Sequence, residues 1–257
     1  GAVGASSPAE VAAQASTIVT MLPSSPHVLE VYTGPSGILS KVQAGTMLIE
    51  CSTIDPDSAR KVAAASKAQS AEFVDAPVSG GTIGAQNATL TFMVGGEKAA
   101  VSQATAVLEL MGKNIVHCGG AGTGQVAKIC NNLVLGITMA GVSEAFYLGT
   151  QLGIDPKVLA DVVNSSSGRS WSSDTYNPCP GVMEGVPSSR GYTGGFACDL
   201  MAKDLSLAVA AAASQKAPLP MGALAQNLYS LMSAGGHGRK DFSGIYEMLQ
   251  KQQLRKE

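Results

Sequence analysis

A lysine and an asparagine four residues apart are the side chains of this sequence best suited to chemistry. Lys128 and Asn132 lie in the segment Gly124-Gln-Val-Ala-Lys-Ile-Cys-Asn-Asn, and Gln125 precedes the lysine by three residues. On a helix these spacings place the three side chains on one face. An ammonium group buried without compensation is costly, so such a lysine is expected to have a partner, a lowered pKa or a wet cleft in front of it. A neutral lysine amine can accept a proton during a reaction, and an amide beside it can hold a substrate oxygen.

The alternative for this polar stripe is a solvated helix face without function. Apolar residues at Ile129, Leu133 and Ile137 give the same segment a long apolar side, and the segment follows directly on the connector Gly119-Gly-Ala-Gly-Thr-Gly. The stripe therefore lies in the first turns of a helix that is largely buried. This pattern predicts a position at a cleft between two domains.

Short apolar runs alternate with helical segments over the first 118 residues. Five runs have the composition of buried strands: Thr17–Leu22, Thr46–Cys51, Glu72–Asp75, Leu90–Val94 and Asn114–Cys118. Asp55-Pro56 is typical of a helix start, because a capping side chain is followed by a proline in the first turn. The alternation predicts βαβ units and a largely parallel sheet.

The second half of the sequence has no strand pattern. Helical spacing is found at about 124–152, 156–165, 199–215, 219–233 and 241–250. A turn-rich stretch from Ser165 to Gly195 separates two of these helices, and a loop of that length is more often functional than accidental. We predict an α/β fold in which an N-terminally truncated Rossmann-type domain (1–120) is joined by a long helix to an all-helical domain (121–257).

Composition excludes several classes of protein. Of 257 residues 45% are hydrophobic and 14% charged, the net charge is −2, and no long basic run is present, which argues against nucleic-acid binding. The five cysteines and three histidines are scattered and form no Cys-x-x-Cys pair. That pattern favours free thiols in a reducing compartment over disulfides or a metal site. The most apolar stretch, Ile129–Ser143, is too short for a membrane span.

Three segments follow predicted strands, at the edge of a parallel sheet where ligands bind. They are Leu22–Ser25, Ser52–Asp55 and Asp75–Thr82. The last contains Ser79-Gly80-Gly81, whose small residues leave backbone amides open to a carboxylate or a phosphate. An ordinary flexible turn is the alternative.

Seven segments together resemble the β-hydroxyacid dehydrogenase family, and within it the 3-hydroxyisobutyrate dehydrogenases. They are Thr20-Met-Leu-Pro, Ser52-Thr-Ile-Asp-Pro, Asp75-Ala-Pro-Val-Ser-Gly-Gly, Thr89-Leu-Thr-Phe-Met-Val-Gly-Gly, Gly122-Thr-Gly-Gln-Val-Ala-Lys-Ile-Cys-Asn-Asn, Ser166-Ser-Gly-Arg-Ser-Trp-Ser-Ser-Asp-Thr-Tyr-Asn-Pro and Leu200-Met-Ala-Lys-Asp-Leu. Each segment is weak alone, but they follow one another in order over essentially the whole chain.

The resemblance implies a role for individual residues. The catalytic pair is Lys128 and Asn132, and the loop for the substrate carboxylate is Ser79, Gly80 and Gly81. The implied cofactor contacts are Leu22, Pro23, His27, Thr53 and Lys203. His27 stands where relatives often carry an asparagine. Lys203 is expected to close over the nicotinamide and to supply a positive charge that lowers the pKa of Lys128.

The resemblance also implies a reaction and a setting. The reaction is the NAD-dependent oxidation of 3-hydroxyisobutyrate to methylmalonate semialdehyde in valine breakdown, with Lys128 handling the hydroxyl proton. The implied assembly is a homodimer or homotetramer, and the implied location is the mitochondrial matrix. A small hydroxy acid is the expected partner, with no role for nucleic acid, membrane or metal.

The sequence departs from the family at its start. The first strand, the Gly-x-Gly-x-x-Gly fingerprint and the acidic ribose ligand have no counterpart, so we expect weakened NAD binding and an exposed sheet edge. Two alternatives stay open: a glyoxylate or succinic semialdehyde reductase of the same family that uses NADP, and a catalytically silent chain that only oligomerises.

Two residues of the long loop have competing interpretations. Trp171 is interpreted as a core anchor of the loop, with a substrate-facing wall as the alternative. Arg169 is interpreted as a loop-surface residue, with binding of a carboxylate as the alternative. Lys203-Asp204 is either a surface ion pair or part of the site.

Overall fold

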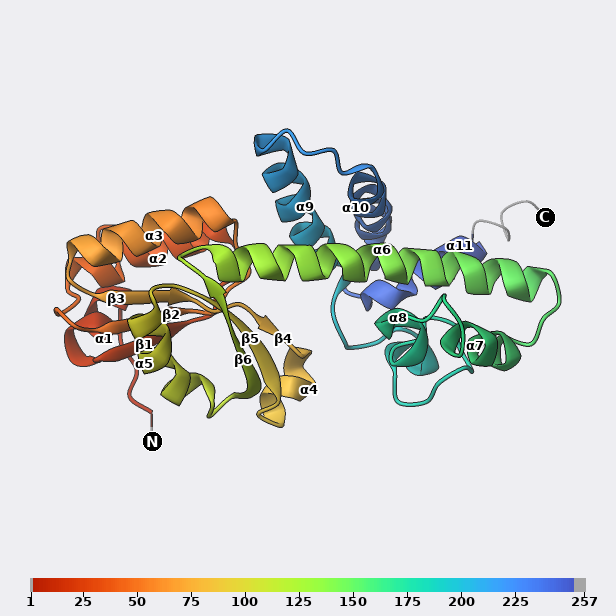
Figure 1. Ribbon diagram of the computed structural model, residues 1–257, viewed down its shortest axis with the longest axis horizontal. Helices are drawn as coiled ribbons and strands as arrows, with labels where there is room; N and C mark the ends of the chain where they lie inside the picture. The colour runs from red at the N-terminus through yellow and green to blue at the C-terminus, as the bar shows by residue number, and fades with distance from the viewer. Residues whose placement is uncertain (1, 252–257) are drawn as a thin grey trace. The chain divides into compact units, whose positions relative to one another are not determined.

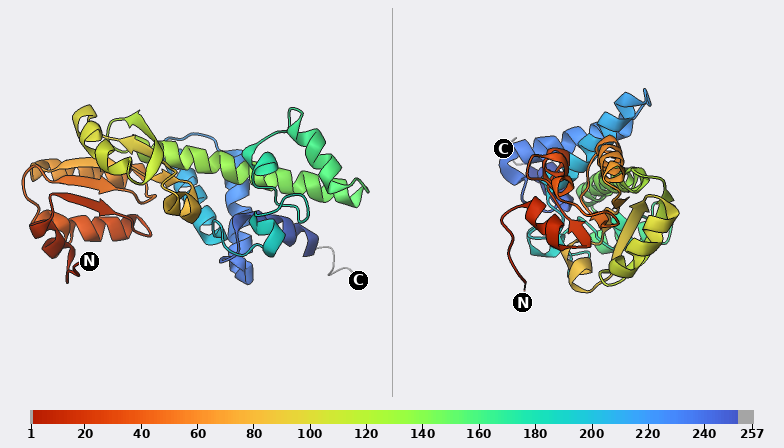
Figure 2. Two further views of the ribbon diagram at one scale, coloured as in Figure 1. Left: turned by 90° about the horizontal axis from the view of Figure 1, so that it is seen from below. Right: turned by 90° about the vertical axis from the view of Figure 1, so that its left-hand side faces the viewer.

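The computed structural model describes residues 2–251 (Figure 1). Unit 1 is Gly1–Ile129 and unit 2 is Cys130–Glu257. One helix, α6 (Thr123–Gln151), begins in unit 1 and ends in unit 2, and it is continuous in all three ribbon views (Figures 1 and 2). Lys128 therefore belongs to unit 1, and Asn132 belongs to unit 2.

Unit 1 alternates strands and helices before α6. Its elements are α1 (Pro8–Gln14), β1 (Thr17–Thr20), α2 (Ser25–Thr33), η1 (Ile38–Ser40), β2 (Met47–Glu50), α3 (Pro56–Ala68), β3 (Glu72–Asp75), β4 (Val78–Ser79), α4 (Gly81–Gln86), β5 (Leu90–Gly95), α5 (Lys98–Leu108) and β6 (Gly112–Gly119). All five predicted strands occur. The predicted helix start is confirmed, because the Asp55 side chain accepts a hydrogen bond from the Ser58 amide at 2.7 Å and Pro56 opens α3.

The strands of unit 1 form one sheet in the order β1-β2-β3-β5-β4, with β6 also paired to β5. β1, β2 and β3 are parallel to one another, and β6 is parallel to β5. β5 runs antiparallel to β3 and to β4. The sheet is therefore rich in parallel pairs, as predicted, but it consists of two parallel groups that run in opposite directions.

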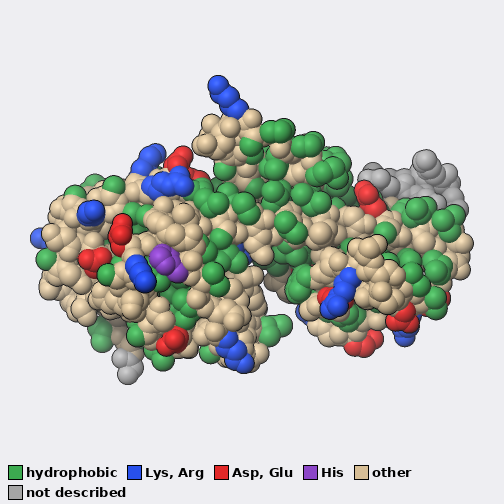
Figure 3. Space-filling view, viewed as in Figure 1, with side chains coloured by type: hydrophobic (Ala, Val, Ile, Leu, Met, Phe, Trp, Pro, Cys, Tyr) green, Lys and Arg blue, Asp and Glu red, His purple; other side chains and the backbone are tan. Residues whose placement is uncertain are grey.

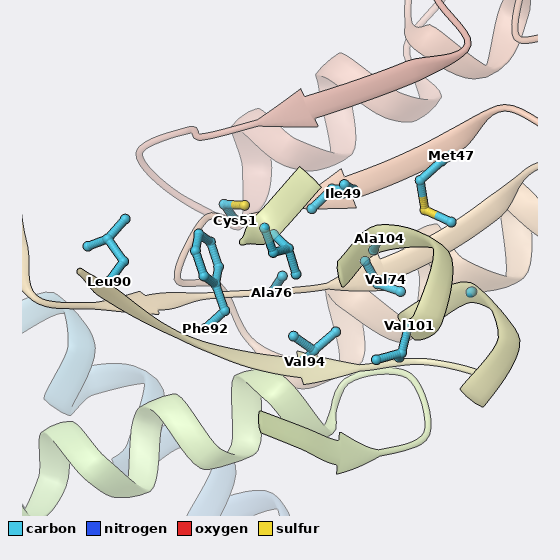
Figure 4. Close-up of a cluster of buried hydrophobic side chains, with 12 residues drawn as sticks. Met47, Ile49, Cys51, Val74, Ala76, Leu90, Phe92, Val94, Val101 and Ala104 are labelled. Carbon is cyan, nitrogen blue, oxygen red and sulfur yellow. The ribbon is translucent and has the colours of Figure 1, made fainter. Parts of the chain in front are cut away.

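Alternating side chains of β2 and β3 build two cores on opposite faces of this sheet. Met47 and Ile49 of β2 pack with residues of α5 in one core, shown in Figure 4. Leu48 faces the other core, together with residues of α1, α2 and α3. The period of two along the strand is what divides the apolar residues between the two layers of helices.

Unit 2 is helical. After α6 it contains α7 (Pro156–Asn164), α8 (Trp171–Asp174), η2 (Pro187–Arg190), α9 (Cys198–Ser214), α10 (Pro220–Met232), the π-helical turn η3 (Ser233–His237), η4 (Phe242–Gly244) and α11 (Ile245–Lys251). The predicted helices are confirmed. The long loop was predicted without helices, but it holds α8 and η2, whose four residues each are too few to show helical spacing in the sequence.

Part of the long apolar helix α6 packs in two hydrophobic cores of unit 2. By length and composition alone α6 could cross a membrane. Met139 and Ala140 lie in a core with α9 and α10, and Phe146 lies in a second core with Ala160 of α7. Parts of α6 thus belong to cores of unit 2, while other apolar residues of the helix, such as Val134 and Leu148, are exposed.

Candidate active site

The polar stripe of α6 is buried. Gln125 and Asn132 are 0% and 1% exposed, and Lys128 is 7% exposed. The alternative of a solvated helix face is therefore wrong for these three residues. Since polar groups are buried only where they find partners, the surroundings of the stripe must be built to receive it.

Asp75 holds the beginning of α6. This residue ends β3 and is fully buried, and its carboxylate accepts hydrogen bonds from the amides of Gly122 (2.7 Å) and Gln125 (3.0 Å). A negative charge at the first turn of a helix is favourable, because the amides there lack partners within the helix. Burial raises the pKa of Asp75, and the hydrogen bonds from Gly122 and Gln125 act in the opposite direction.

Glycine at two positions allows α6 to approach the sheet closely. A Cβ on Gly124 would lie 2.2 Å from the carbonyl oxygen of Met93, and a Cβ on Gly95 would lie 2.6 Å from Asp75 Oδ1. No side chain fits at such distances. The Gly-rich segment before α6 thus serves close packing of the helix start against β5 and β3.

Gln125 joins α6 to the loop that contains Thr53. Its side chain donates to the carbonyl of Ser52 at 2.8 Å and accepts from the amide of Ile54 at 3.0 Å. Thr53, one of the predicted cofactor contacts, lies between these two residues and is half-buried. One side chain of the stripe therefore fixes the peptide groups on both sides of a predicted cofactor residue.

The loop after β1 is tied to the same segment. The amide of Leu22 donates to the hydroxyl of Ser52 at 2.7 Å. Pro23 and His27 are exposed, and the His27 ring nitrogen Nδ1 lies 2.8 Å from the hydroxyl of Ser24. The predicted cofactor residues after β1 and β2 are thus brought together through Ser52.

A second buried carboxylate, Glu50, forms hydrogen bonds with residues at the ends of β1 and β2. Its Oε1 accepts from the Ser52 amide at 2.6 Å, and its Oε2 accepts from the hydroxyl of Thr20, which also contacts the hydroxyl of Tyr32 at 2.9 Å. Burial raises the pKa of Glu50, and its hydrogen bonds with Ser52 and Thr20 oppose that shift. Both Glu50 and Asp75 point inward, so neither exposes its charge at this edge of the sheet.

The Ser79-Gly80-Gly81 segment is positioned separately, by strand pairing. Val78 and Ser79 form β4 and pair with Phe92 and Thr91 of β5. The sequence did not predict a strand here, because two residues are too few to show alternation. Gly80 and Gly81 follow with φ angles of +131° and +62°, which favour glycine, and both are exposed.

In unit 2 a buried aspartate connects Asn132 with Lys203. The amide Nδ2 of Asn132 donates to Asp204 Oδ2 at 2.5 Å, and Lys203 Nζ lies 2.9 Å from Asp204 Oδ1. Asp204 is 3% exposed, so the Lys203-Asp204 pair is not the surface ion pair that the sequence left open. The sequence did not identify Asp204 as a link to Asn132, because 72 residues separate them.

The long loop places its aromatic residues in a stack. Trp171 stacks on Tyr176 with ring centroids 4.7 Å apart, and Tyr176 stacks in turn on Phe242. Trp171 is 47% exposed, so its interpretation as a core anchor is only half right: one face of the ring packs and much of the side chain is open. Arg169 is exposed and paired with Asp174 at 2.6 Å, in agreement with a loop-surface role.

The residues after β1 and β2 fit a nicotinamide dinucleotide. These loops lie at the carboxyl ends of parallel strands, where nucleotides bind in open α/β sheets. They offer apolar surface at Leu22 and Pro23 and a half-buried hydroxyl at Thr53. The inward direction of Glu50 and Asp75 also keeps two carboxylates away from an anionic ligand. Among residues 2–251, no group of three His, Cys, Asp or Glu side chains could hold a metal ion.

Comparisons with known proteins agree with this arrangement. Residues 1–120 match the family model of the NAD binding domain of 6-phosphogluconate dehydrogenase. Residues 122–249 match the model described as NAD-binding of NADP-dependent 3-hydroxyisobutyrate dehydrogenase. The chain therefore consists of NAD-binding family domains over nearly its whole length.

Individual relatives are similar over nearly the whole chain. A probable mitochondrial 3-hydroxyisobutyrate dehydrogenase of Dictyostelium discoideum is 58% identical over 98% of this chain and 78% of its own length. An NAD-dependent L-serine dehydrogenase of Pseudomonas aeruginosa is 47% identical over 96% of this chain and 83% of its own length. Among solved structures, the Mycobacterium tuberculosis 3-hydroxyisobutyrate dehydrogenase with L-serine is 39% identical with a TM-score of 0.89, covering 94% of this chain and 81% of that one.

The fold and the relatives lead to the same family. The α/β unit with a parallel-rich sheet, the long helix and the helical unit that follows are the architecture of the solved relative. The chain belongs to the 3-hydroxyisobutyrate dehydrogenase family, a family of NAD-dependent oxidoreductases.

Proposed function

We propose that this chain oxidises the primary alcohol of 3-hydroxyisobutyrate to the semialdehyde with NAD as the hydride acceptor. The observation that carries the proposal is the burial of Lys128 on α6, one helical turn before the buried Asn132, in a chain of this dehydrogenase family. A lysine is one of the side chains that can transfer a proton to or from a hydroxyl.

Lys128 is proposed as the residue that accepts the hydroxyl proton at Nζ. Bound NAD would supply the acceptor for the hydride that leaves the carbinol carbon. To accept the proton, the amine must be neutral when the substrate is in place. General base assistance of this kind accelerates a reaction by about 10²–10⁴-fold.

Asn132 is proposed to hold the substrate oxygen. The bond from Nδ2 to Asp204 fixes the plane of its amide, so Asp204 acts as a positioning residue. Lys203, paired with the same carboxylate, is proposed as a cofactor contact, together with Leu22, Pro23, His27 and Thr53. The exposure of Gly80 and Gly81 supports the proposal that Ser79, Gly80 and Gly81 receive the substrate carboxylate.

L-serine is a second candidate substrate. Both molecules are acids with a three-carbon backbone and a hydroxymethyl group. At the carbon next to the carboxylate, 3-hydroxyisobutyrate carries a methyl group and serine carries an ammonium group. The observation that favours serine is its presence in the description of the solved relative and in the name of the Pseudomonas relative.

The proposal extends to assembly, domains and setting. Exposed apolar side chains at Met221, Leu224 and Leu231 of α10 support a homodimer or homotetramer formed through unit 2, and Figure 3 shows hydrophobic side chains gathered over α9 and α10. Domains of 1–120 and 121–257 are proposed, with support from the family models that match residues 1–120 and 122–249. The mitochondrial Dictyostelium relative supports a place in the mitochondrial matrix, and we assign the step to valine breakdown.

A substrate panel tests the function. Formation of NADH is measured with 3-hydroxyisobutyrate and with L-serine, and reduction of glyoxylate and succinic semialdehyde is measured with NADPH. We expect the highest kcat/KM for 3-hydroxyisobutyrate with NAD. Faster reduction of either aldehyde with NADPH would overturn the assignment, and so would the absence of both turnover and NAD binding by calorimetry, which would identify a silent chain.

A further inference from the structure

Gln125 stands out as a fully buried polar side chain that has no assigned part in the reaction. It lies on α6 three residues before Lys128, which is about 4.5 Å of rise along the helix. Both ends of its amide are used, the nitrogen on the Ser52 carbonyl and the oxygen on the Ile54 amide.

The two peptide groups that Gln125 binds cannot easily find other partners. Ser52 and Ile54 are both fully buried, and they lie beyond the last residue of β2, where the sheet no longer supplies hydrogen bonds. A buried carbonyl or amide without a partner is costly, so the loop follows the Gln125 side chain. The peptide groups on both sides of Thr53 are thereby held by a residue on α6.

The backbone of Gln125 is itself fixed. Asp75 accepts from the Gln125 amide, and the glycines at 95 and 124 leave the helix start no room for an inserted side chain. The other contacts of the loop run to α2 and to the β1 loop: the Asp55 amide donates to the Ser25 hydroxyl at 3.2 Å and the Leu22 amide to Ser52. The two hydrogen bonds of the Gln125 side chain join this loop to the helix that carries Lys128.

We infer that Gln125 is a positioning residue that helps to set the Thr53 cofactor loop at a fixed distance from Lys128, so that its two hydrogen bonds contribute to both cofactor binding and turnover. The inference rests on the proposed function, because it takes Lys128 as the base and Thr53 as a cofactor contact. It assigns no chemical step to Gln125. Lys128 can assist the reaction only if the substrate hydroxyl lies next to it while the carbinol carbon faces the hydride acceptor.

Two substitutions separate the two hydrogen bonds. Gln125→Met keeps the length of the side chain and removes both bonds. Gln125→Glu keeps an acceptor for the Ile54 amide, but when ionised it has no hydrogen to donate to the Ser52 carbonyl. The same substitutions at Gln103, which is exposed on α5 of the same unit, are the controls.

The pH dependence of Gln125→Glu supplies a readout that loss of packing would not give. A protonated glutamic acid can donate one hydrogen bond and accept another, as glutamine does. Both hydrogen bonds, with Ser52 and with Ile54, can therefore form again when the new carboxyl binds a proton. Charged groups on the elements around it are Glu50, Asp75, Asp55, Arg60 and Lys128. The acids Glu50 and Asp75 are fully buried nearby and disfavour a further negative charge, so protonation is expected well above the ordinary range for glutamate.

We expect Gln125→Met to raise the KM for NAD and to lower kcat, each by roughly tenfold, since one buried hydrogen bond is worth about that factor. Hydrogen exchange at the Ile54 amide should quicken in the same variant. For Gln125→Glu, kcat/KM relative to the parent should recover as the pH falls, with an unchanged circular dichroism spectrum. The Gln103 variants should match the parent in all three measurements.

Kinetics of Gln125→Met equal to those of Gln103→Met in an active parent would overturn the inference. An effect on stability alone, with KM and kcat unchanged, would also overturn it. If the parent itself shows no turnover with NAD, the proposed function fails and this inference fails with it, an outcome distinct from the other two.

Discussion

At the scale of single residues, the candidate site is organised by buried carboxylates that take no part in the proposed reaction. Asp75 accepts from the first amides of α6, Glu50 orders Thr20 and Ser52, and Asp204 fixes Asn132. Each of the three is almost fully buried. Burying a charge is costly, so their hydrogen bonds must compensate for lost hydration, and the side chains they hold are correspondingly fixed.

Substitution of Glu50 tests this cost directly. Because burial raises the pKa of Glu50, the folded chain retains a proton that the unfolded chain releases near its ordinary pKa of about 4.3. The contribution of Glu50 to stability is therefore full below that value and is lost as the pH rises through the folded-state pKa. Glu50→Gln removes this term and keeps a donor and an acceptor for Thr20 and Ser52.

We expect the free energy of unfolding of Glu50→Gln, relative to the parent, to increase by on the order of 1 kcal/mol between about pH 4 and about pH 8. Urea unfolding at several pH values measures it. The same change at Glu109, an exposed acid after α5, serves as the control. A difference between Glu50→Gln and the parent that does not vary with pH would contradict the account.

At the scale of elements, the decisive feature is how α6 begins. Its first amides are satisfied by Asp75 from the end of β3, and its first turn packs on β5 through Gly124. Because it is buried and capped by a side chain from β3, the start of α6 is held in one position relative to the sheet. The hydrogen bonds to Asp75 therefore fix the start of α6, and with it the direction of the polar side chains that follow.

Asp75→Asn tests the capping role. Asparagine offers one acceptor where the carboxylate offers two, and its amide nitrogen would face a backbone amide. We expect a loss of about 1–3 kcal/mol in the free energy of unfolding, since one buried amide loses its partner. Asp57→Asn on the exposed face of α3, where Asp57 pairs only with Arg60, should cost less than about 0.5 kcal/mol.

Urea denaturation followed by circular dichroism compares the two variants. Equal losses for Asp75→Asn and Asp57→Asn would show that Asp75 does not hold α6.

The elements themselves were largely predictable, and the links between them were not. Apolar runs and the Asp55-Pro56 start predicted β2 and α3 at nearly their observed positions, because burial and capping are local signals. β4 and α8 were missed, since two and four residues are too few to show a period. The contacts of Asp75 with α6 and of Asn132 with Asp204 span 47 to 72 residues, and the sequence holds no local trace of such pairs. Lys128 and Asn132 could be proposed together from the sequence because both lie on one helix.

At the scale of the whole molecule, the chain combines two kinds of unit with different tasks. Unit 1 holds the predicted contacts after β1 and β2, and unit 2 holds Asn132, Lys203 and the apolar residues exposed on α10. Met221, Leu224 and Leu231 are each more than half exposed. Apolar side chains gathered on one helix are typical of a surface that binds another protein, and the proposed occupant is a second copy of this chain.

The double variant Leu224→Lys with Leu231→Lys tests that assembly. Two ammonium groups in an apolar contact between copies would lose hydration, so we expect the multimer of the parent to dissociate to monomers, as measured by light scattering. Leu110→Lys, at an exposed position of unit 1, should leave the mass unchanged. A monomeric parent, or a double variant of unchanged mass, would contradict the proposed interface.

The central claim is that Lys128 carries the proton in the oxidation of a hydroxy acid by NAD. Its most direct test is the kcat of Lys128→Ala at saturating NAD and 3-hydroxyisobutyrate, with Lys128→Met as a variant of similar volume and Lys157→Ala on the exposed start of α7 as the control. The account predicts that kcat falls by about 10²–10⁴-fold in both Lys128 variants, and that Lys157→Ala behaves as the parent. Turnover of the folded Lys128 variants at the rate of the parent would contradict it.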